Sequence, residues 1–132
     1  MKENVDFQVI STNSFAFSDV KEWTKELFDK YPKTDGIIAS NDITATAILH
    51  EALKRGMAIP DELQIIGYDD IPQSSLLFPA LSTIRQPAYE MGKQAASLII
   101  SIIRKETVNK KHIKLPVTYI DCDTTRRLNS NG

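Results

Sequence analysis

Residues 36–67 read GIIASNDITATAILHEALKRGMAIPDELQIIG, and the order of patterns in this stretch predicts the fold. An apolar run at 36–39 is typical of a strand that is buried on both faces of a sheet. A helical period follows from about Ile43 to Arg55, and Gly56 stands where a helix C-terminus favours glycine. A second apolar run, 63–67, completes a strand, helix, strand unit, which indicates a right-handed crossover between parallel strands.

The segments on either side extend this alternation. We expect further strands at 7–10, 81–85 and 115–121, and further helices at 19–30 and 88–105. Ser18 stands at the N-cap position of the first of these helices, and Pro87 at the first position of the second. The expected fold class is therefore α/β, part of a doubly wound parallel sheet. The broad apolar face of the helix at 88–105 should be covered by a partner chain or a further segment.

The composition excludes several classes of protein. Of the 132 residues, 42% are hydrophobic and 25% are charged, which is typical of one soluble globular domain. With 16 Lys and Arg against 17 Asp and Glu, the net charge of -1 does not favour a self-sufficient DNA-binding domain. One cysteine excludes an intrachain disulfide, and only two histidines accompany it. We expect a cytoplasmic protein without a metal, a cofactor or a membrane span.

Polar segments follow three of the expected strands, at the positions where open α/β sheets bind ligands. These segments are residues 12–17, 40–42 and 68–70. Asp69 and Asp70 could form an acid–base pair, but no positioned histidine, nucleophile elbow or P-loop accompanies them. The residue types favour binding over catalysis, with Phe15 stacking on a sugar-type ligand and Asn41 and Asp69 forming hydrogen bonds to it.

Each of these residues also has a purely structural interpretation. Asn41 or Asp42 could be the N-cap of the following helix, a role worth roughly 1 kcal/mol. Asp69 and Asp70 could shape a turn through hydrogen bonds to their own backbone. Phe15 could belong to the core. The residue types alone leave these alternatives open. The neighbouring Tyr68 is expected to pack beneath the loop rather than to contact a ligand.

Four motifs stand out when the middle of the chain is considered as a whole. They are ASND at 39–42, G-x-x-I-P-x-x-L-x-I-I-G-Y-D-D at 56–70, P-A-L-S-T-I-R-Q-P at 79–87 and M-G-x-x-A at 91–95. Together they resemble the lactose-repressor/galactose-repressor (LacI/GalR) family of bacterial transcription regulators, from about Phe7 to about Thr125. Repressors of sucrose or ribose operons are the nearest look-alikes. The resemblance implies a core of two subdomains that are similar to type I periplasmic sugar-binding proteins.

The resemblance also implies a domain organisation. Residues 1–84 and 112–125 would form an incomplete C-terminal subdomain, and 86–110 a crossover with a helix that packs in the N-terminal subdomain. Gln86 and Pro87 mark the crossover, and residues 126–132 form a tail. Relative to such regulators, this sequence lacks the helix-turn-helix headpiece, the hinge helix and most of the N-terminal subdomain. It also lacks the first strand and helix units of the C-terminal subdomain, so the core is expected to be truncated. The polar segment from Thr124 onward is expected to fray.

The implied function is that of the effector-binding and dimerisation core of a sugar-responsive repressor. Effector contacts fall on Phe15, Asn41 and Asp69, while Asp42 and Asp70 keep the structural roles of cap and turn. The effector would be a sugar or sugar phosphate, with a purine as the other option. The dimer contact corresponds to Leu76 and Leu77, which could instead be core residues.

Two partners and one competing function complete these expectations. The protein would form a homodimer and would contact operator DNA only through the missing headpiece. It would be no enzyme and would have no catalytic residues. The alternative function is that of a periplasmic sugar-binding protein of a transport system, which shares the fold.

Overall fold

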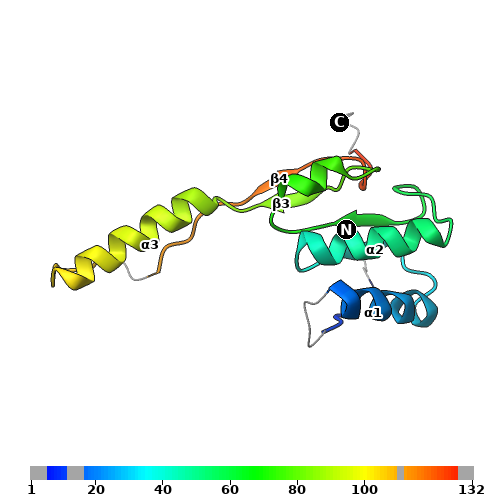
Figure 1. Ribbon diagram of the computed structural model, residues 1–132, viewed down its shortest axis with the longest axis horizontal. Coiled ribbons are helices and arrows are strands. Elements are labelled where there is room, and N and C mark those ends of the chain that lie inside the picture. The colour runs from blue at the N-terminus through cyan, green and yellow to red at the C-terminus, as the bar shows by residue number, and fades with distance from the viewer. Residues whose placement is uncertain (1–5, 12–16, 110–111, 128–132) are drawn as a thin grey trace.

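The computed structural model describes residues 6–11, 17–109 and 112–127. Along these residues the helices and strands alternate through most of the chain (Figure 1). They are α1 (Phe17–Lys30), β1 (Gly36–Ile38), α2 (Asp42–Lys54), β2 (Gln64–Ile66), the 3-10 helix η1 (Pro72–Leu76), β3 (Thr83–Arg85), α3 (Ala88–Ile103) and β4 (Thr118–Ile120).

The sheet begins with the parallel pair that the sequence predicts. β1 and β2 pair in parallel with Ile38 opposite Ile66, and α2 connects them. β3 and β4 form an antiparallel pair, which is joined to β2 by a parallel bridge between Ile66 and Ser82. The strand expected at 7–10 is wrong, because residues 6–11 form no strand and their side chains are exposed. An apolar run becomes a strand only where a neighbouring strand accepts its backbone hydrogen bonds.

The core lies between α2 and one face of the β1–β2 pair, with α1 packed on α2 (Figure 1). Its buried side chains lie at the helical spacing or the strand positions expected of them. They are Leu27, Phe28, Ala39, Ala45, Ile48, Leu49, Ala52, Leu63, Ile65 and Leu81. Burying a side chain of leucine or isoleucine size contributes about 1.5–3 kcal/mol. The expectation that β1 is buried on both faces is wrong, since Ile38 is 81% exposed.

The C-terminus of α2 agrees with its sequence signal, whereas the N-terminus of α1 does not. Gly56 adopts the expected left-handed conformation, with φ of 78°, directly after α2. Ser18 is not the N-cap of α1, because the helix already begins at Phe17. Its hydroxyl instead donates to Oδ1 of Asp19 at 3.1 Å.

The third helix, α3, forms an arm that extends away from the body (Figure 1). α3 has no buried residue, and its apolar side chains, including Ile99, Ile102 and Ile103, are exposed. No other element of the described chain covers this face, which agrees with the broad apolar stripe in the sequence. None of the helices in the described ranges is long and apolar enough to cross a membrane.

The segment that follows β4 does not begin as a frayed tail. Thr124 and Thr125 are buried, and Thr124 is bonded to β2 in both directions. The amide of Ile65 donates to the carbonyl of Thr124 at 2.9 Å, and the Thr124 hydroxyl donates to the carbonyl of Ile65 at 2.7 Å. The expectation of fraying is therefore wrong for Thr124 and Thr125, whereas residues 128–132 of the expected tail lie outside the described residues. Polar residues stay ordered here because β2 offers unpaired backbone groups at its side.

Candidate functional site

The carboxyl ends of β1 and β2 place two of the predicted ligand residues beside each other. Ile38 and Ile66 are partners across the parallel pair, and each ends its strand. Asn41 follows Ile38 by three positions (41 minus 38), and Asp69 follows Ile66 by three (69 minus 66). Because parallel strands end at the same edge, both residues belong to one rim of the sheet. We call residues 40–42 and 67–71 the rim.

Asn41 performs the capping role that the sequence left open. Its backbone is extended and its Oδ1 accepts a 2.7 Å hydrogen bond from the amide of Thr44 in the first turn of α2. The side chain is half-buried at the rim. Capping occupies the carbonyl oxygen of the amide, whereas the amide nitrogen has two donors of its own. The cap therefore does not exclude a contact with a ligand.

Asp69 and Asp70 hold an uncommon backbone conformation. Their φ angles are 121° and 57°, in the region that favours glycine. Such residues cost of the order of 1–3 kcal/mol each and persist where their surroundings hold them in place. The amide of Asp69 is held by the carbonyl of Ile84 at 2.9 Å, and its exposed carboxylate accepts a 2.6 Å hydrogen bond from Nε2 of Gln86.

Asp70 has the positive φ of a turn residue, but in the described structure its carboxylate accepts from Arg85 and not from its own backbone, which the turn hypothesis requires. Its Oδ2 pairs with Nε of Arg85 at 2.5 Å, and its amide lies 3.4 Å from the hydroxyl of Thr83. Because the Arg85 side chain is largely exposed, the ion pair contributes at most about 1 kcal/mol. Both aspartates of the motif are thus joined to the strand β3 and the residue after it.

Asp42 is not the helix cap that the sequence predicts. Its carboxylate is buried, with the whole residue only 1% exposed, and it accepts three hydrogen bonds from distant parts of the chain. Oδ1 accepts from the hydroxyl of Thr83 at 2.5 Å. Oδ2 accepts from the hydroxyl of Ser74 at 2.6 Å and from the amide of Ile71 at 3.0 Å. A buried carboxylate needs such donors to offset the loss of water.

Gly67 is required by this carboxylate rather than by a turn. A Cβ atom at Gly67 would lie 2.2 Å from Oδ1 of Asp42 and 3.0 Å from Cδ2 of Leu81. The φ of Gly67 is not among the positive values, so the backbone conformation does not require glycine here. The absence of a side chain lets the strand pass directly beside the Asp42 carboxylate.

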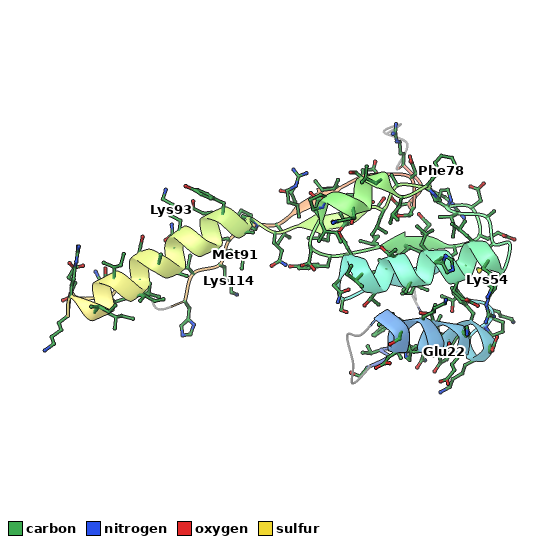
Figure 2. The ribbon with its side chains drawn as sticks, viewed as in Figure 1. Glu22, Lys54, Phe78, Met91, Lys93 and Lys114 are labelled. Carbon is green, nitrogen blue, oxygen red and sulfur yellow. The ribbon has the colours of Figure 1, made fainter. Side chains whose placement is uncertain are left out.

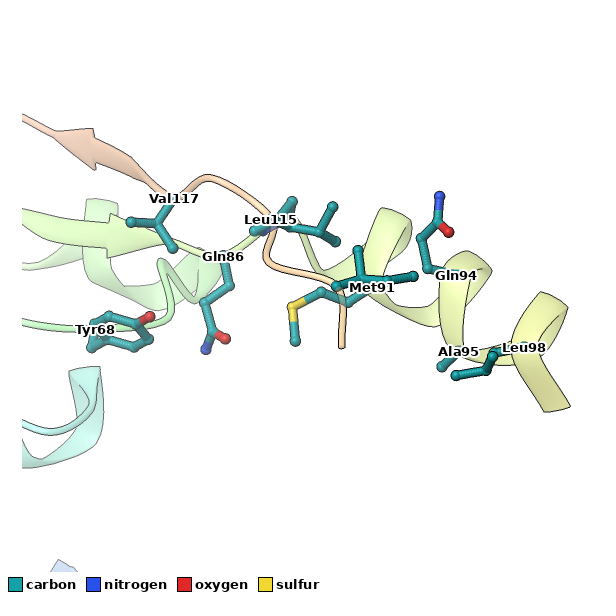
Figure 3. A pocket seen from close by; sticks show the side chains of 10 residues that line it. Tyr68, Gln86, Met91, Gln94, Ala95, Leu98, Leu115 and Val117 are labelled. Carbon is teal, nitrogen blue, oxygen red and sulfur yellow. The ribbon is translucent and has the colours of Figure 1, made fainter. Parts of the chain in front are cut away.

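Gln86 and Pro87 connect β3 to α3. A groove of about 360 Å³ starts here and runs along α3 (Figure 3). It is lined by Tyr68, Gln86, Pro87, Met91, Gln94, Ala95, Leu98, Ile113, Leu115 and Val117. Tyr68 is half-buried and lines this groove, whereas we expected it to pack beneath the loop. Gln86 therefore lines the groove and is also hydrogen-bonded to Asp69 of the rim.

The two leucines of the predicted dimer contact differ in their surroundings. Leu76 is 82% exposed, whereas Leu77 packs against the core and so adopts its structural alternative. Phe78, which we did not predict, is 94% exposed and lies at the outer edge of the body (Figure 2). Leu76 and Phe78 form what we call the apolar edge. The alternation of exposed, packed and exposed residues could not be read from the three consecutive letters LLF.

Three further features concern the predicted stacking residue, groups that could hold a metal ion, and the cysteine. Phe15, the predicted stacking residue, lies outside the described residues. Within the ranges that are described, no group of three or more His, Cys, Asp and Glu side chains is arranged to hold a metal ion. Burial raises the pKa of the Cys122 thiol, and the carboxylates of Asp123 and Asp121 raise it further.

Comparison with known proteins extends these observations to the whole chain. A family model described as periplasmic binding protein-like domain matches residues 3–125. The ribose operon repressor of Bacillus subtilis (strain 168) is 62% identical over 123 residues, which cover 93% of this chain and 38% of that protein. The ribose operon repressor of Lactococcus lactis subsp. lactis (strain IL1403) is 40% identical over 126 residues, which cover 96% of this chain and 38% of that protein.

A solved structure shows the same arrangement of elements. The crystal structure of a LacI family transcriptional regulator from Arthrobacter sp. FB24, in complex with lactose, aligns with a TM-score of 0.75 and 27% sequence identity. The alignment covers 86% of this chain and 42% of that one. This chain thus spans less than half the length of each of these proteins.

Proposed function

This chain belongs to the family of periplasmic binding protein-like domains, and from that premise we propose that it serves a sugar-responsive transcriptional repressor as part of its effector-binding and dimerisation core. The two curated relatives named above are repressors of ribose operons. They favour this function over that of a sugar-binding protein in a transport system. Regulators of this kind act in the cytoplasm, and that is the location we propose.

The observation that carries the proposal is the chemistry of the rim. Asn41 and Asp69 stand at equivalent positions after paired strands, and Gln86 is hydrogen-bonded to Asp69. A sugar hydroxyl both donates and accepts hydrogen bonds, so a carboxylate with two amides is a suitable set of partners. The strained backbone of Asp69 supports a functional role, because strain of this kind concentrates at ligand sites. Asn41, Asp69 and Gln86 are therefore the effector contacts that we assign to this chain.

The effector would act by shifting a conformational equilibrium. Residues 86 and 87 lead from the body to the arm, so a ligand held at Asp69 and Gln86 would bind differently in two orientations of body and arm. A coupling of this kind typically amounts to about 1–3 kcal/mol. In a dimeric repressor the shift would change the spacing of the DNA-binding headpieces, which we place outside this chain.

We assign dimerisation to the apolar edge rather than to Leu77. Leu76 and Phe78 are the exposed members of the segment, and large aromatic side chains commonly anchor interfaces. Leu77 is occupied by the core. The homodimer would thus form through the outer side of η1 and the residues that follow it.

A nuclear magnetic resonance titration of the 15N-labelled chain tests the effector assignment. We expect D-ribose or ribose 5-phosphate to shift the amide signals of Asn41, Asp69 and Gln86 at millimolar concentration, since part of a cleft binds weakly. Asp69→Asn should reduce the shifts, whereas Asp61→Asn makes the same change at an exposed carboxylate away from the rim and should not. If neither the two sugars nor a purine such as hypoxanthine shifts the rim signals, the assignment is wrong.

A further inference from the structure

The buried carboxylate of Asp42 has no role in the function proposed above, although it is the most connected side chain near the rim. It sits at the first residue of α2, directly after the cap Asn41. No salt bridge to Asp42 occurs within the described part of the chain. All its hydrogen bonds come instead from neutral donors on three other segments: β3, the end of the rim and η1.

These three contacts enclose the strained part of the rim. Asp69 and Asp70, with φ of 121° and 57°, lie between Gly67, which faces the Asp42 carboxylate, and Ile71, whose amide donates to it. A strained backbone is kept only where its neighbours are held on both sides. The only other described hydrogen bonds that hold these two residues come from β3 and Gln86. Asp42 therefore holds the 67–71 segment of the rim from the side of α2.

The same carboxylate reaches the segment that carries the apolar edge. Ser74 is buried in η1 and donates to Asp42, whereas Leu76 is exposed two residues later. Ser75, the neighbour of Ser74, bonds only within its own helix, to the carbonyl of Pro72 at 2.9 Å. One atom, Oδ2 of Asp42, thus accepts from both the rim and η1.

We propose that Asp42 is a positioning residue, which fixes the rim backbone around Asp69 and joins it to η1 through a single buried carboxylate. The inference rests on the proposed function, because it takes the rim to be the place where the effector binds. The positioning of the rim backbone by Asp42 does not itself depend on a ligand. Weakening the Ser74 contact should loosen the rim, although Ser74 forms no hydrogen bond with Asp69 or Asn41 in the described structure.

Amide hydrogen exchange in the full 132-residue chain, without a sugar, tests this. The amides to follow are those of Asp69 and Ile71 in the rim, with that of Ile65 as the reference, because it donates to Thr124 on the other side of β2. Asp42→Asn should speed exchange at both rim amides about tenfold or more relative to Ile65, and Ser74→Ala about threefold or more. Thr83→Val should act like Ser74→Ala. The matched control Ser75→Ala should leave the ratios unchanged.

Two results would overturn the inference. One is an equal change at the rim and at Ile65, which would make Asp42 a contributor to global stability alone. The other is unchanged exchange at Asp69 in both Ser74→Ala and Thr83→Val, and this comparison decides the matter if Asp42→Asn does not fold. A wild-type rim that fails to respond to D-ribose would instead count against the proposed function, and would leave the exchange ratios to decide the role of Asp42.

Discussion

Nε2 of Gln86 donates a 2.6 Å hydrogen bond to Oδ1 of Asp69, which joins the crossover into α3 to the rim at the end of β2. The two residues are 17 positions apart in the chain. Their contact lies where the body meets the arm, at one end of the groove along α3 (Figure 3). The Asp69 side chain is exposed, so a ligand can reach this hydrogen bond. The relationship leads to the first prediction.

Replacing Gln86 by leucine removes the donor and leaves a side chain of similar length. We expect Gln86→Leu to weaken D-ribose binding about threefold to tenfold, corresponding to about 0.5–1.5 kcal/mol for a hydrogen bond between accessible groups. The shift of the Asp69 amide signal during a titration measures the dissociation constant. Gln94→Leu is the control, because Gln94 also lines the groove but is bonded to Glu90 at 2.6 Å. Equal effects of the two variants would exclude a specific role for Gln86.

The close approach of Gly67 and Asp42 makes a second prediction. In Gly67→Ala the new Cβ would meet a carboxylate oxygen that three hydrogen bonds hold in place, so we expect the free energy of unfolding to fall by about 1–3 kcal/mol. Urea denaturation followed by circular dichroism measures it. Gly36→Ala, with nothing within 4 Å of its Cβ, should cost far less. Similar losses in both variants would show that backbone freedom, and not the contact, makes glycine necessary.

The apolar edge makes a third prediction, on association. We expect Phe78→Ser to raise the dissociation constant of the dimer about tenfold or more, because an exposed aromatic anchor is removed. The free energy of unfolding of the monomeric Phe78→Ser variant should hardly differ from that of the wild type. Sedimentation across a dilution series measures association. Tyr89→Ser, at an exposed aromatic residue of α3, is the control and should leave association unchanged.

Leu77 should behave in the opposite way within the same segment. Because it packs against the core, Leu77→Ala should lower the free energy of unfolding by about 2–4 kcal/mol. Any change in association should follow from that loss of stability. A chain that is monomeric at every concentration, or a Phe78→Ser protein that still dimerises as the wild type does, would contradict the interface that we propose.

Cys122 makes a fourth prediction, on pH dependence. Burial, assisted by Asp123 and Asp121, raises the pKa of its thiol in the folded state. The rate of alkylation by iodoacetamide should therefore reach half its maximum at a higher pH in the folded chain than in urea. The protonated thiol stabilises the fold below the unfolded pKa, and this contribution is lost as the pH rises through the folded pKa. As Cys122 is the single cysteine, Cys122→Ser should abolish labelling; identical profiles in the two states would contradict the prediction.

The part of the fold that the sequence predicts well is the unit from β1 to β2. Apolar residues at helical spacing and a glycine after the helix are local signals, and α2 and Gly56 agree with them. The strand expected at 7–10 shows the limit of such signals, because a strand also depends on a partner strand elsewhere. Thr124 shows the converse, since a polar residue was ordered by a strand far away in the chain.

The candidate site divides in the same way. The positions of Asn41 and Asp69 at one rim follow from strand order, and the sequence by itself determined them, together with the family resemblance and the break between strand and helix at Gln86 and Pro87. Only the tertiary structure decided that Asp42 is a buried acceptor rather than a cap. Its partners Ser74 and Thr83 lie 32 and 41 residues away, and no local period encodes a hydrogen bond across such a separation. These hydrogen bonds form because the tertiary structure places α2, β3 and η1 next to one another.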